Sequence, residues 1–268
     1  MNLANSKKII SVIIYGGTGQ AKVVRPIIEQ QGGRVVAVFD DTNDLKSPFE
    51  DIPIHYGFDS LIKWSKSNNI ANTGFVVCIG NPNGDVRYQI SKKISKLGFA
   101  SYSVVDKNSI ISNNSVIGKG VQIMAGAVIM PEVKIGEQCI INTKASVDHE
   151  CVINNGCEVG PGATLCGRIN MKFNSCVGAG ATITPRCTIG ENSIVGAGAV
   201  VINDIDEHTY LDLLVKTNQI DSALKCAWYE FKDNEFSTAP DFKANFRISY
   251  LNKLFNKGEG NSLNIRNS

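Results

Sequence analysis

The sequence predicts an α/β domain followed by a parallel β-helix and then an aromatic-rich C-terminal extension. An aliphatic residue recurs at every sixth position from Ile111 to Val201, the period of hexapeptide repeats. Before the repeat, apolar strand-like runs alternate with glycine turns and helical patterns. After it, aromatic residues from Trp228 to Phe255 change the composition. We therefore expect three regions, residues 1–106, 107–204 and 205–268.

The repeat is unbroken, and its period excludes other regular structures. Six residues match neither the 3.6-residue turn of an α-helix nor the two-residue alternation of a plain strand. Each hexapeptide would form one short strand and one turn, with its aliphatic side chain inside a three-sided prism and mostly small residues two positions earlier. The aliphatic series is Ile111, Ile117, Ile123, Ile129, Ile135, Ile141, Val147, Ile153, Val159, Leu165, Met171, Val177, Ile183, Ile189, Val195 and Val201.

Glycine often follows the aliphatic position. We expect tight turns there, in a backbone conformation that glycine adopts without strain from a Cβ atom. One coil of three sides contains eighteen residues, so residues eighteen apart should stack in one column. The glycines are Gly118, Gly136, Gly160, Gly178, Gly190 and Gly196.

Composition excludes several classes of protein. The 268 residues have a formal net charge of +2, without the basic field typical of nucleic-acid binding. No run of about 18 apolar residues indicates membrane insertion. Cys139, Cys151, Cys157 and Cys187 fall on the small-residue series and no CxxC pair occurs, so we interpret the cysteines as buried thiols of a cytoplasmic protein.

The first residues predict an α/β unit with a glycine turn, which is either a nucleotide-binding turn or a plain tight turn because the full G-x-G-x-x-G pattern is absent. An apolar strand from Ile9 to Tyr15 leads into a glycine turn, a helix and a second strand, Val35 to Phe39. Backbone N–H groups of such a turn bind phosphate at a helix N-terminus, and an acid after the second strand can accept hydrogen bonds from a ribose or base. The turn is Gly16, Gly17, Thr18 and Gly19, and the acids are Asp40 and Asp41.

The α/β pattern continues to the start of the repeat, near Asn108. We expect helices from Phe58 to Ser67 and from Asp85 to Leu97, and strands from Phe75 to Ile79 and from Ser101 to Val105. In a parallel sheet, ligands bind beyond the carboxyl ends of the strands. The glycine turn, the acid pair and the Gly80–Asn81 segment should therefore surround one crevice.

One histidine lies within the repeat. His149 is flanked by Asp148 and Glu150, and it shares a column with Pro131, Gly167 and Pro185. A single surface histidine is more often incidental than functional. Its position alone therefore does not indicate catalysis.

The chain resembles the bacterial sugar acyltransferases of the NeuD/PglD/VioB type over roughly residues 8 to 205. The resemblance is most specific in Ile141-Asn142-Thr143 and in the segment from Asp148 to Ile153, DHECVI. It implies a Rossmann-like domain that binds a nucleotide-sugar, a left-handed β-helix that binds acetyl-CoA, and a homotrimer without a metal.

The resemblance also implies roles for residues. His149 would be the general base, oriented by Glu150 or Asp148, of which Glu150 stands at the family's position. The Gly167 N–H would lie near the thioester carbonyl and Asn142 near the acceptor. The pantetheine arm of acetyl-CoA would run along the coils at Gly178, Gly196, Ala197 and Gly198.

The chain departs from the family pattern in three places. Gln20 stands where many members have histidine after the glycine turn, and Glu158 stands where some amino-sugar members have a second histidine. A segment from Tyr210 to Lys216 replaces the usual loop over the coenzyme. These departures concern the acceptor and the adenine end of the coenzyme.

Four hypotheses follow. The first is N-acetylation of a nucleotide-linked 4-amino-4,6-dideoxysugar, carried by UDP, dTDP or GDP, for bacterial surface glycans, and the second is O-acetylation of a sialic-acid-like sugar. The third, a zinc hydrolyase on the same fold, needs three histidine ligands, whereas His55 and His208 lie outside the repeat. The fourth is a scaffold in which the β-helix serves only to trimerise the chain.

Overall fold

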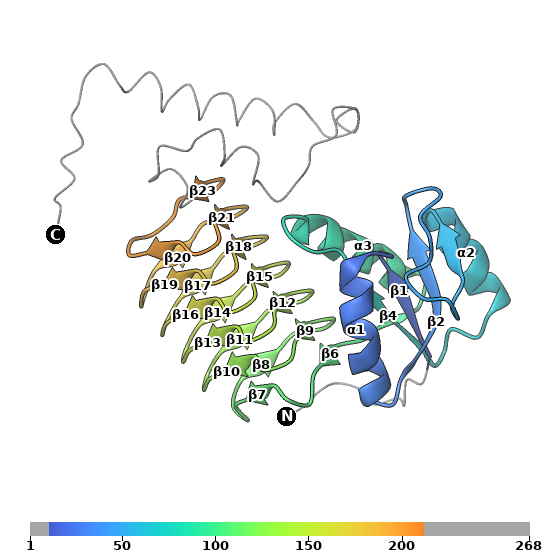
Figure 1. Ribbon diagram of the computed structural model, residues 1–268, viewed down its shortest axis with the longest axis horizontal. Coiled ribbons are helices and arrows are strands. Elements are labelled where there is room, and N and C mark those ends of the chain that lie inside the picture. The colour runs from blue at the N-terminus through green and yellow to red at the C-terminus, as the bar shows by residue number, and fades with distance from the viewer. Residues whose placement is uncertain (1–10, 212–268) are drawn as a thin grey trace, which may run out of the picture. The chain divides into compact units, whose positions relative to one another are not determined.

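The computed structural model describes residues 11–211 (Figure 1). Its first part is a five-stranded parallel sheet in the order β3-β2-β1-β4-β5. Strand order reverses between β1 and β4, the position at which open α/β sheets bind their ligands. The elements are β1 Ser11–Tyr15, α1 Gly19–Gln30, β2 Arg34–Asp40, β3 Ile54–Tyr56, α2 Phe58–Ser67, β4 Thr73–Val77, α3 Gly84–Lys96 and β5 Ala100–Ser101.

The two faces of this sheet belong to different cores. Side chains alternate along β1, so Ile13 packs in one core with residues of α2 and α3, such as Leu61. Val12 packs on the other face in a core that contains α1 residues and also Met124 and Ile140 of the repeat. The α/β domain is therefore joined to the β-helix by a shared apolar core.

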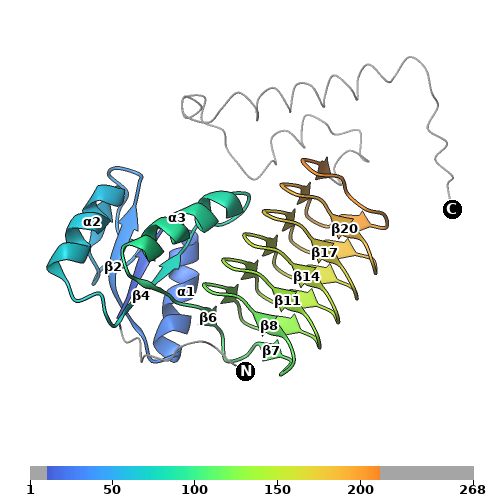
Figure 2. The same cartoon turned by 180° about the vertical axis from the view of Figure 1, so that it is seen from behind.

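The hexapeptide region is a parallel β-helix, as predicted (Figure 2). From β6 to β19, each strand pairs with the strand eighteen residues further on, for example Val147 with Leu165, and this produces three sheets. The strands are β6 Val104–Val105, β7 Ile110–Ile111, β8 Val116–Ile117, β9 Gln122–Ile123, β10 Val128–Ile129, β11 Lys134–Ile135, β12 Ile140–Ile141, β13 Ser146–Val147, β14 Val152–Ile153, β15 Glu158–Val159, β16 Thr164–Leu165, β17 Asn170–Met171, β18 Cys176–Val177, β19 Thr182–Ile183, β20 Thr188–Ile189, β21 Ile194–Val195, β22 Val200–Val201 and β23 Tyr210–Leu211.

The predicted aliphatic series forms the axis of the β-helix. From Ile123 to Val201 each member is at most 3% exposed, so the whole series is buried inside the prism. The four cysteines of the small-residue series are buried beside it, and the seven cysteines within residues 11–211 are all free thiols.

Three strand predictions were wrong in detail. The predicted strand from Ser101 to Val105 is divided between two sheets, because β5 pairs with β4 whereas β6 pairs with β9 of the β-helix. Strand β3 was missed because its three residues are too short for an alternation pattern. Strand β4 begins and ends two residues before the predicted strand.

The repeat period ends at Val201, but the hydrogen bonding of the β-helix continues. Ile205 bridges to Ile189, and β23 pairs with β21 at a spacing of sixteen residues, Ile194 with Tyr210. The aromatic residues from Trp228 onward, on which the predicted extension depends, lie outside the described residues.

The expected role of the glycines after the aliphatic positions was also wrong. None of the six has a positive φ; for Gly118 and Gly178 the requirement is close approach, because a Cβ atom would lie 2.5 Å and 2.6 Å from backbone of the next coil. The left-handed conformation recurs instead three residues after each aliphatic position from Ile117 to Val195. It is adopted by Gly120, Gly126, Glu132, Gln138, Lys144, Glu150, Gly156, Gly162, Arg168, Asn174, Gly180, Arg186, Asn192 and Gly198.

Candidate active site

His149 lies at the turn between β13 and β14, and its side chain is 50% exposed. Its Nδ1 atom is 2.8 Å from Oε2 of Glu150. Asp148 instead accepts a hydrogen bond of 2.7 Å from the His149 backbone N–H. Of the two flanking acids, Glu150 therefore contacts the imidazole and Asp148 supports the backbone.

Arg168 is a member of this cluster that the sequence analysis missed. Its Nε donates a hydrogen bond of 2.9 Å to the same Glu150 oxygen that faces His149. The Arg168 guanidinium, and then His149, hold the pKa of Glu150 below its ordinary value, so this carboxylate stays charged. The signal was present in the sequence, because Arg168 is eighteen residues after Glu150 and therefore in the same column.

The imidazole of His149 lies against the backbone of Gly167. A Cβ atom at this glycine would be 2.5 Å from Nε2 of His149, so any side chain would displace the ring. The next N–H, of Arg168, donates to the His149 carbonyl at 2.9 Å. Within residues 11–211 the Gly167 N–H has no acceptor, so it can donate to an oxygen placed beside the imidazole.

The glycine turn of the α/β domain is held by Asp40. Gly17 N–H donates to Asp40 Oδ2 at 2.6 Å, and Thr42 N–H donates to Oδ1 at 2.8 Å. Gly16 has a φ of 104° and a Cβ there would be 2.6 Å from the Cys78 carbonyl oxygen, so only glycine fits. The glycine turn and Asp40 therefore meet at one edge of the sheet, beside Cys78 directly after β4, with buried Asp40 holding the turn.

A cavity of about 310 Å³ opens beside Asp41. Asp41 is exposed and accepts a hydrogen bond of 2.6 Å from the Tyr15 hydroxyl; burial and this carboxylate raise the pKa of Tyr15. Among the predicted substrate residues, Asp41 is the one that lines this cavity. Its lining residues are Tyr15, Asp41, Phe58, Asp85, Val86, Gln89, Ile90 and Lys93.

The predicted residues Thr18, Gly19 and Gly80 have simpler surroundings. Thr18 is the N-cap residue of α1, without a capping bond from its side chain, and Gly19 is the first residue of the helix. A Cβ atom at Gly19 or Gly80 would meet nothing within 4 Å. Open space is compatible with a ligand above these backbones.

A second group of polar residues lies where α3 meets the β-helix. Asn81, Arg87 and Glu158 line one small recess, and hydrogen bonding from Asn142 reaches Glu158. Burial raises the pKa of Glu158, and the charge of Arg87 and the bond from Asn142 oppose this rise. Predicted residues of two regions, Asn81 and Asn142, are thus brought close to the same carboxylate.

His149 is not part of that group within one chain. The α/β domain contacts β9, β12 and the turns that precede strands of their sheet, through residues such as Gln122 and Gly156. His149 lies at the corner between the other two sheets, after β13 and before β14. The residues near the predicted nucleotide-sugar loops and the residues around His149 therefore lie at different corners of the same coil.

The predicted coenzyme residues form a corner of small side chains. A Cβ atom at Gly178 would be 2.6 Å from Ala197 N, so adjacent coils are in close contact there. Gly196 is buried, Ala197 and Gly198 are exposed, and Gly198 has a φ of 70°. Such a corner leaves backbone groups accessible to an extended ligand.

The other two histidines are not close to His149 in the fold. His55 stacks on Phe39 in the α/β domain with ring centroids 5.1 Å apart, and His208 lies in the last turn before β23. Residues 11–211 contain no group of three histidine, cysteine or acidic side chains arranged for a metal. In the same part of the chain, no helix has the length and apolar character that crossing a membrane requires.

Two family models match the sequence. Residues 11–94 match the PglD N-terminal domain. Residues 114–148 and 169–203 match the bacterial transferase hexapeptide model of six repeats. Among curated proteins, none matches the sequence.

Solved structures with both parts of the fold are similar to this chain. A complex of a histidine-to-alanine variant of GDP-perosamine N-acetyltransferase from Caulobacter crescentus with CoA and GDP-perosamine is 30% identical, with a TM-score of 0.69 over 75% of this chain and 93% of that one. The acetyltransferase domain of PglB from Neisseria gonorrhoeae with acetyl coenzyme A is 25% identical, with a TM-score of 0.66 over 75% and 94% of the two chains. WeeI from Acinetobacter baumannii, 24% identical with a TM-score of 0.67 over 75% and 95%, shares the fold.

Proposed function

Because the chain belongs to the PglD-type family of hexapeptide-repeat sugar acetyltransferases, enzymes that use acetyl-CoA, we propose that it acetylates the amino group of a nucleotide-linked 4-amino-4,6-dideoxysugar. The observation that carries this proposal is the His149 imidazole, held by Glu150 and lying against Gly167. The relative from Caulobacter, which binds CoA and GDP-perosamine, supports an amino sugar on a nucleoside diphosphate as the acceptor.

The cluster accounts for each step of acetyl transfer. Glu150 would accept a hydrogen bond from Nδ1–H of His149, so that Nε2 is free to take a proton from the acceptor amine as its nitrogen attacks the thioester carbon. The negative charge that develops on the carbonyl oxygen is stabilised by the Gly167 N–H. When the tetrahedral intermediate collapses, the C–S bond breaks, and the imidazolium returns the proton to the CoA sulfur.

The site requires a second copy of the chain. The nucleotide loops adjoin one sheet of the β-helix, whereas His149 lies at the corner between the other two sheets. In a homotrimer of left-handed β-helices, His149 of one copy would face the Asn142 side of its neighbour. Gly178, Gly196, Ala197 and Gly198 would then line the pantetheine channel between the copies. This cytoplasmic enzyme would supply an acetylated sugar for surface glycans.

The nucleotide-sugar would occupy the edge of the α/β sheet. The phosphates would lie over the backbone of Gly16 to Gly19, with Gly17 held in place by Asp40. Asp41, beside the cavity, would accept hydrogen bonds from the ribose or the base. The Gly80–Asn81 segment would lie near the sugar.

Thiol release from acetyl-CoA tests the proposal. The purified protein is given UDP-, dTDP- and GDP-linked 4-amino sugars, with His149→Ala as the test variant and Lys134→Ala, an exposed position on the same β-helix, as the control. We expect turnover of one nucleotide-sugar and a loss of about 10² to 10⁴ in His149→Ala alone. Turnover of hydroxyl acceptors instead would favour O-acetylation, and activity equal to wild type in His149→Ala would exclude this histidine as the base.

A further inference from the structure

Arg87 in α3 is the cation to explain. Its side chain is fully buried, and no other lysine or arginine within residues 11–209 is. A guanidinium cannot lose its charge in a protein, so burial requires hydrogen-bond acceptors around it. The positions of its acceptors therefore indicate the role of Arg87.

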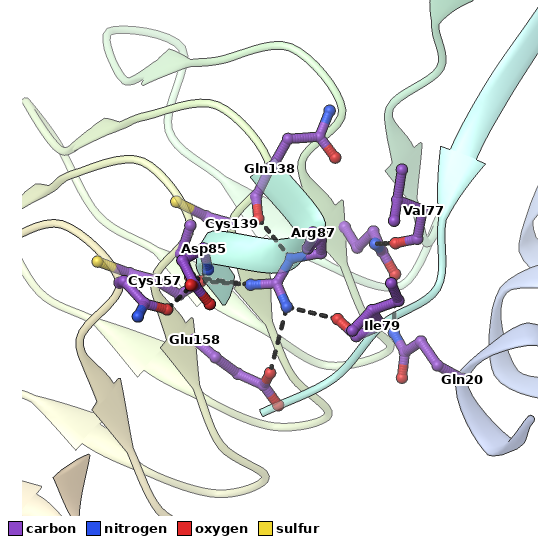
Figure 3. Close-up of polar contacts among 12 residues, drawn as sticks. Gln20, Val77, Ile79, Asp85, Arg87, Gln138, Cys139, Cys157 and Glu158 are labelled. Carbon is purple, nitrogen blue, oxygen red and sulfur yellow. Dashed lines mark hydrogen bonds and ion pairs between the residues drawn. The ribbon is translucent and has the colours of Figure 1, made fainter. Parts of the chain in front are cut away.

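The acceptors come from both domains (Figure 3). Arg87 Nη1 donates to the Ile79 carbonyl, in the loop after β4, at 2.5 Å. The remaining bonds go to the β-helix, to the carbonyls of Gln138 at 2.7 Å and Gly156 at 2.9 Å, with the Glu158 carboxylate 3.9 Å from Nη1. These carbonyls belong to two successive coils, so the guanidinium is aligned along the axis of the β-helix.

A second polar connection holds the other nucleotide loop. Gln20, in the first turn of α1 directly after the glycine turn, donates to Gln122 Oε1 at 2.8 Å. Gln122 is fully buried in β9 and donates in turn to the Val77 carbonyl at 2.8 Å. The glycine turn is therefore connected to the β-helix through Gln20, and the segment after β4 is connected to it through Arg87.

The contact also has a steric requirement. A Cβ atom at Gly84, the first residue of α3, would lie 1.9 Å from the Gly156 carbonyl oxygen. The next N–H, of Asp85, donates to Asn174 Oδ1 at 2.9 Å. The start of α3 is thus in direct backbone contact with the coil that also accepts from Arg87.

From these contacts we infer that Arg87 is a positioning residue, which sets the height of the nucleotide-sugar loops along the β-helix relative to the catalytic imidazole. Coils are about 4.8 Å apart, the spacing of strands in a sheet. A shift of one coil would remove the amino group from the reach of His149, and a displacement of about 1 Å already costs up to 10²-fold in rate. This inference rests on the proposed acetyl transfer.

Arg87→Ala, compared with wild type, tests it. We measure kcat with the nucleotide-linked amino sugar that wild type turns over, and also the affinity and stoichiometry of CoA and of the corresponding nucleoside diphosphate. We expect kcat per occupied site to fall about ten-fold or more, with both affinities within about two-fold of wild type. Arg87→Lys should recover part of the rate, and Lys96→Ala, exposed on the same helix, should match wild type.

Each other outcome contradicts a particular claim. If kcat falls only in proportion to lost binding sites, Arg87 merely stabilises the fold and the inference is overturned. An unchanged kcat overturns it as well. If Arg87→Ala does not fold, Gln122→Leu takes its place and must lower kcat while both affinities stay near those of wild type. A kcat of Gln122→Leu equal to that of wild type would overturn the inference. Wild type inactive on every amino sugar overturns the proposed function itself, and with it the inference.

Discussion

The His149 cluster of the β-helix and the glycine turn of the α/β domain are built in different ways. In the β-helix, His149 contacts the next residue, Glu150, and residues one coil later, Gly167 and Arg168. In the α/β domain, Gly17 is held by an acid 23 residues away, and Gln20 is bonded to a residue 102 positions away. In a repeat, a constant spacing along the sequence determines which residues are in contact. In an open sheet, the order of the strands determines it.

The largest expected effect tests the contact between His149 and Gly167, which lie eighteen residues apart in one column of the β-helix. In Gly167→Ala the new methyl group would occupy the position of the imidazole, 2.5 Å from Nε2. We expect kcat to fall about 10²-fold, because the base is displaced by more than 1 Å. Thr164→Ala, in the same coil, is the control. A rate within two-fold of wild type in Gly167→Ala would mean that the ring lies elsewhere during catalysis.

A second prediction concerns stability and compares the two regions directly. In Gly160→Ala the Cβ atom would be 2.8 Å from the Val177 carbonyl oxygen and the Ala179 nitrogen of the next coil. We expect the free energy of unfolding to fall by about 1–3 kcal/mol, the usual cost of overpacking. Gly80→Ala, where a Cβ atom meets nothing within 4 Å, should change it by less than about 0.5 kcal/mol. Urea denaturation measures both values.

The substitution Asp40→Asn tests the contact between Asp40 and the glycine turn of the α/β domain. The carboxylate accepts from Gly17 and Thr42, and the neutral amide would offer only one oxygen to these two donors. We expect a loosened glycine turn and about ten-fold weaker nucleotide binding by titration calorimetry, the loss of one charge-assisted hydrogen bond. Asp44→Asn, exposed in the following loop, is the control. Equal nucleotide affinity in both variants would show that the conformation of the turn does not depend on the hydrogen bonds to Asp40.

The smallest expected effect belongs to Arg168. Arg168 shares the Glu150 oxygen with His149 and lowers the pKa of that carboxylate. In Arg168→Gln the first cause that lowers the pKa of Glu150 is lost, so the pKa of this carboxylate rises and the acid limb of the pH–rate profile should move to higher pH. Since all three side chains are exposed, solvent screens their interaction and we expect a small shift. Glu132→Gln, one coil earlier in the same column, should leave the profile unchanged, and a shift to lower pH in Arg168→Gln would contradict this account.

The accuracy of the sequence predictions follows the same division. The axis of the β-helix from Ile123 to Val201 was predictable residue by residue, because each aliphatic position repeats the same environment. The short strand β3 and the division of Ser101 to Val105 between two sheets were not, because neither leaves a periodic pattern. The glycines were recognised, but the reason for them, contact between coils, depends on the distance between backbones.

The sequence by itself determined the architecture, the family and the position of the candidate base, because a six-residue period and a short motif are local properties. The tertiary structure showed that Glu150, the acid that the resemblance favoured, contacts the imidazole. Only the tertiary structure decided that Arg168 joins them and that Asp40 holds the glycine turn. It also showed that a buried arginine connects the two domains. These contacts depend on the directions of side chains and on the packing of distant segments, and no spacing along the chain encodes either.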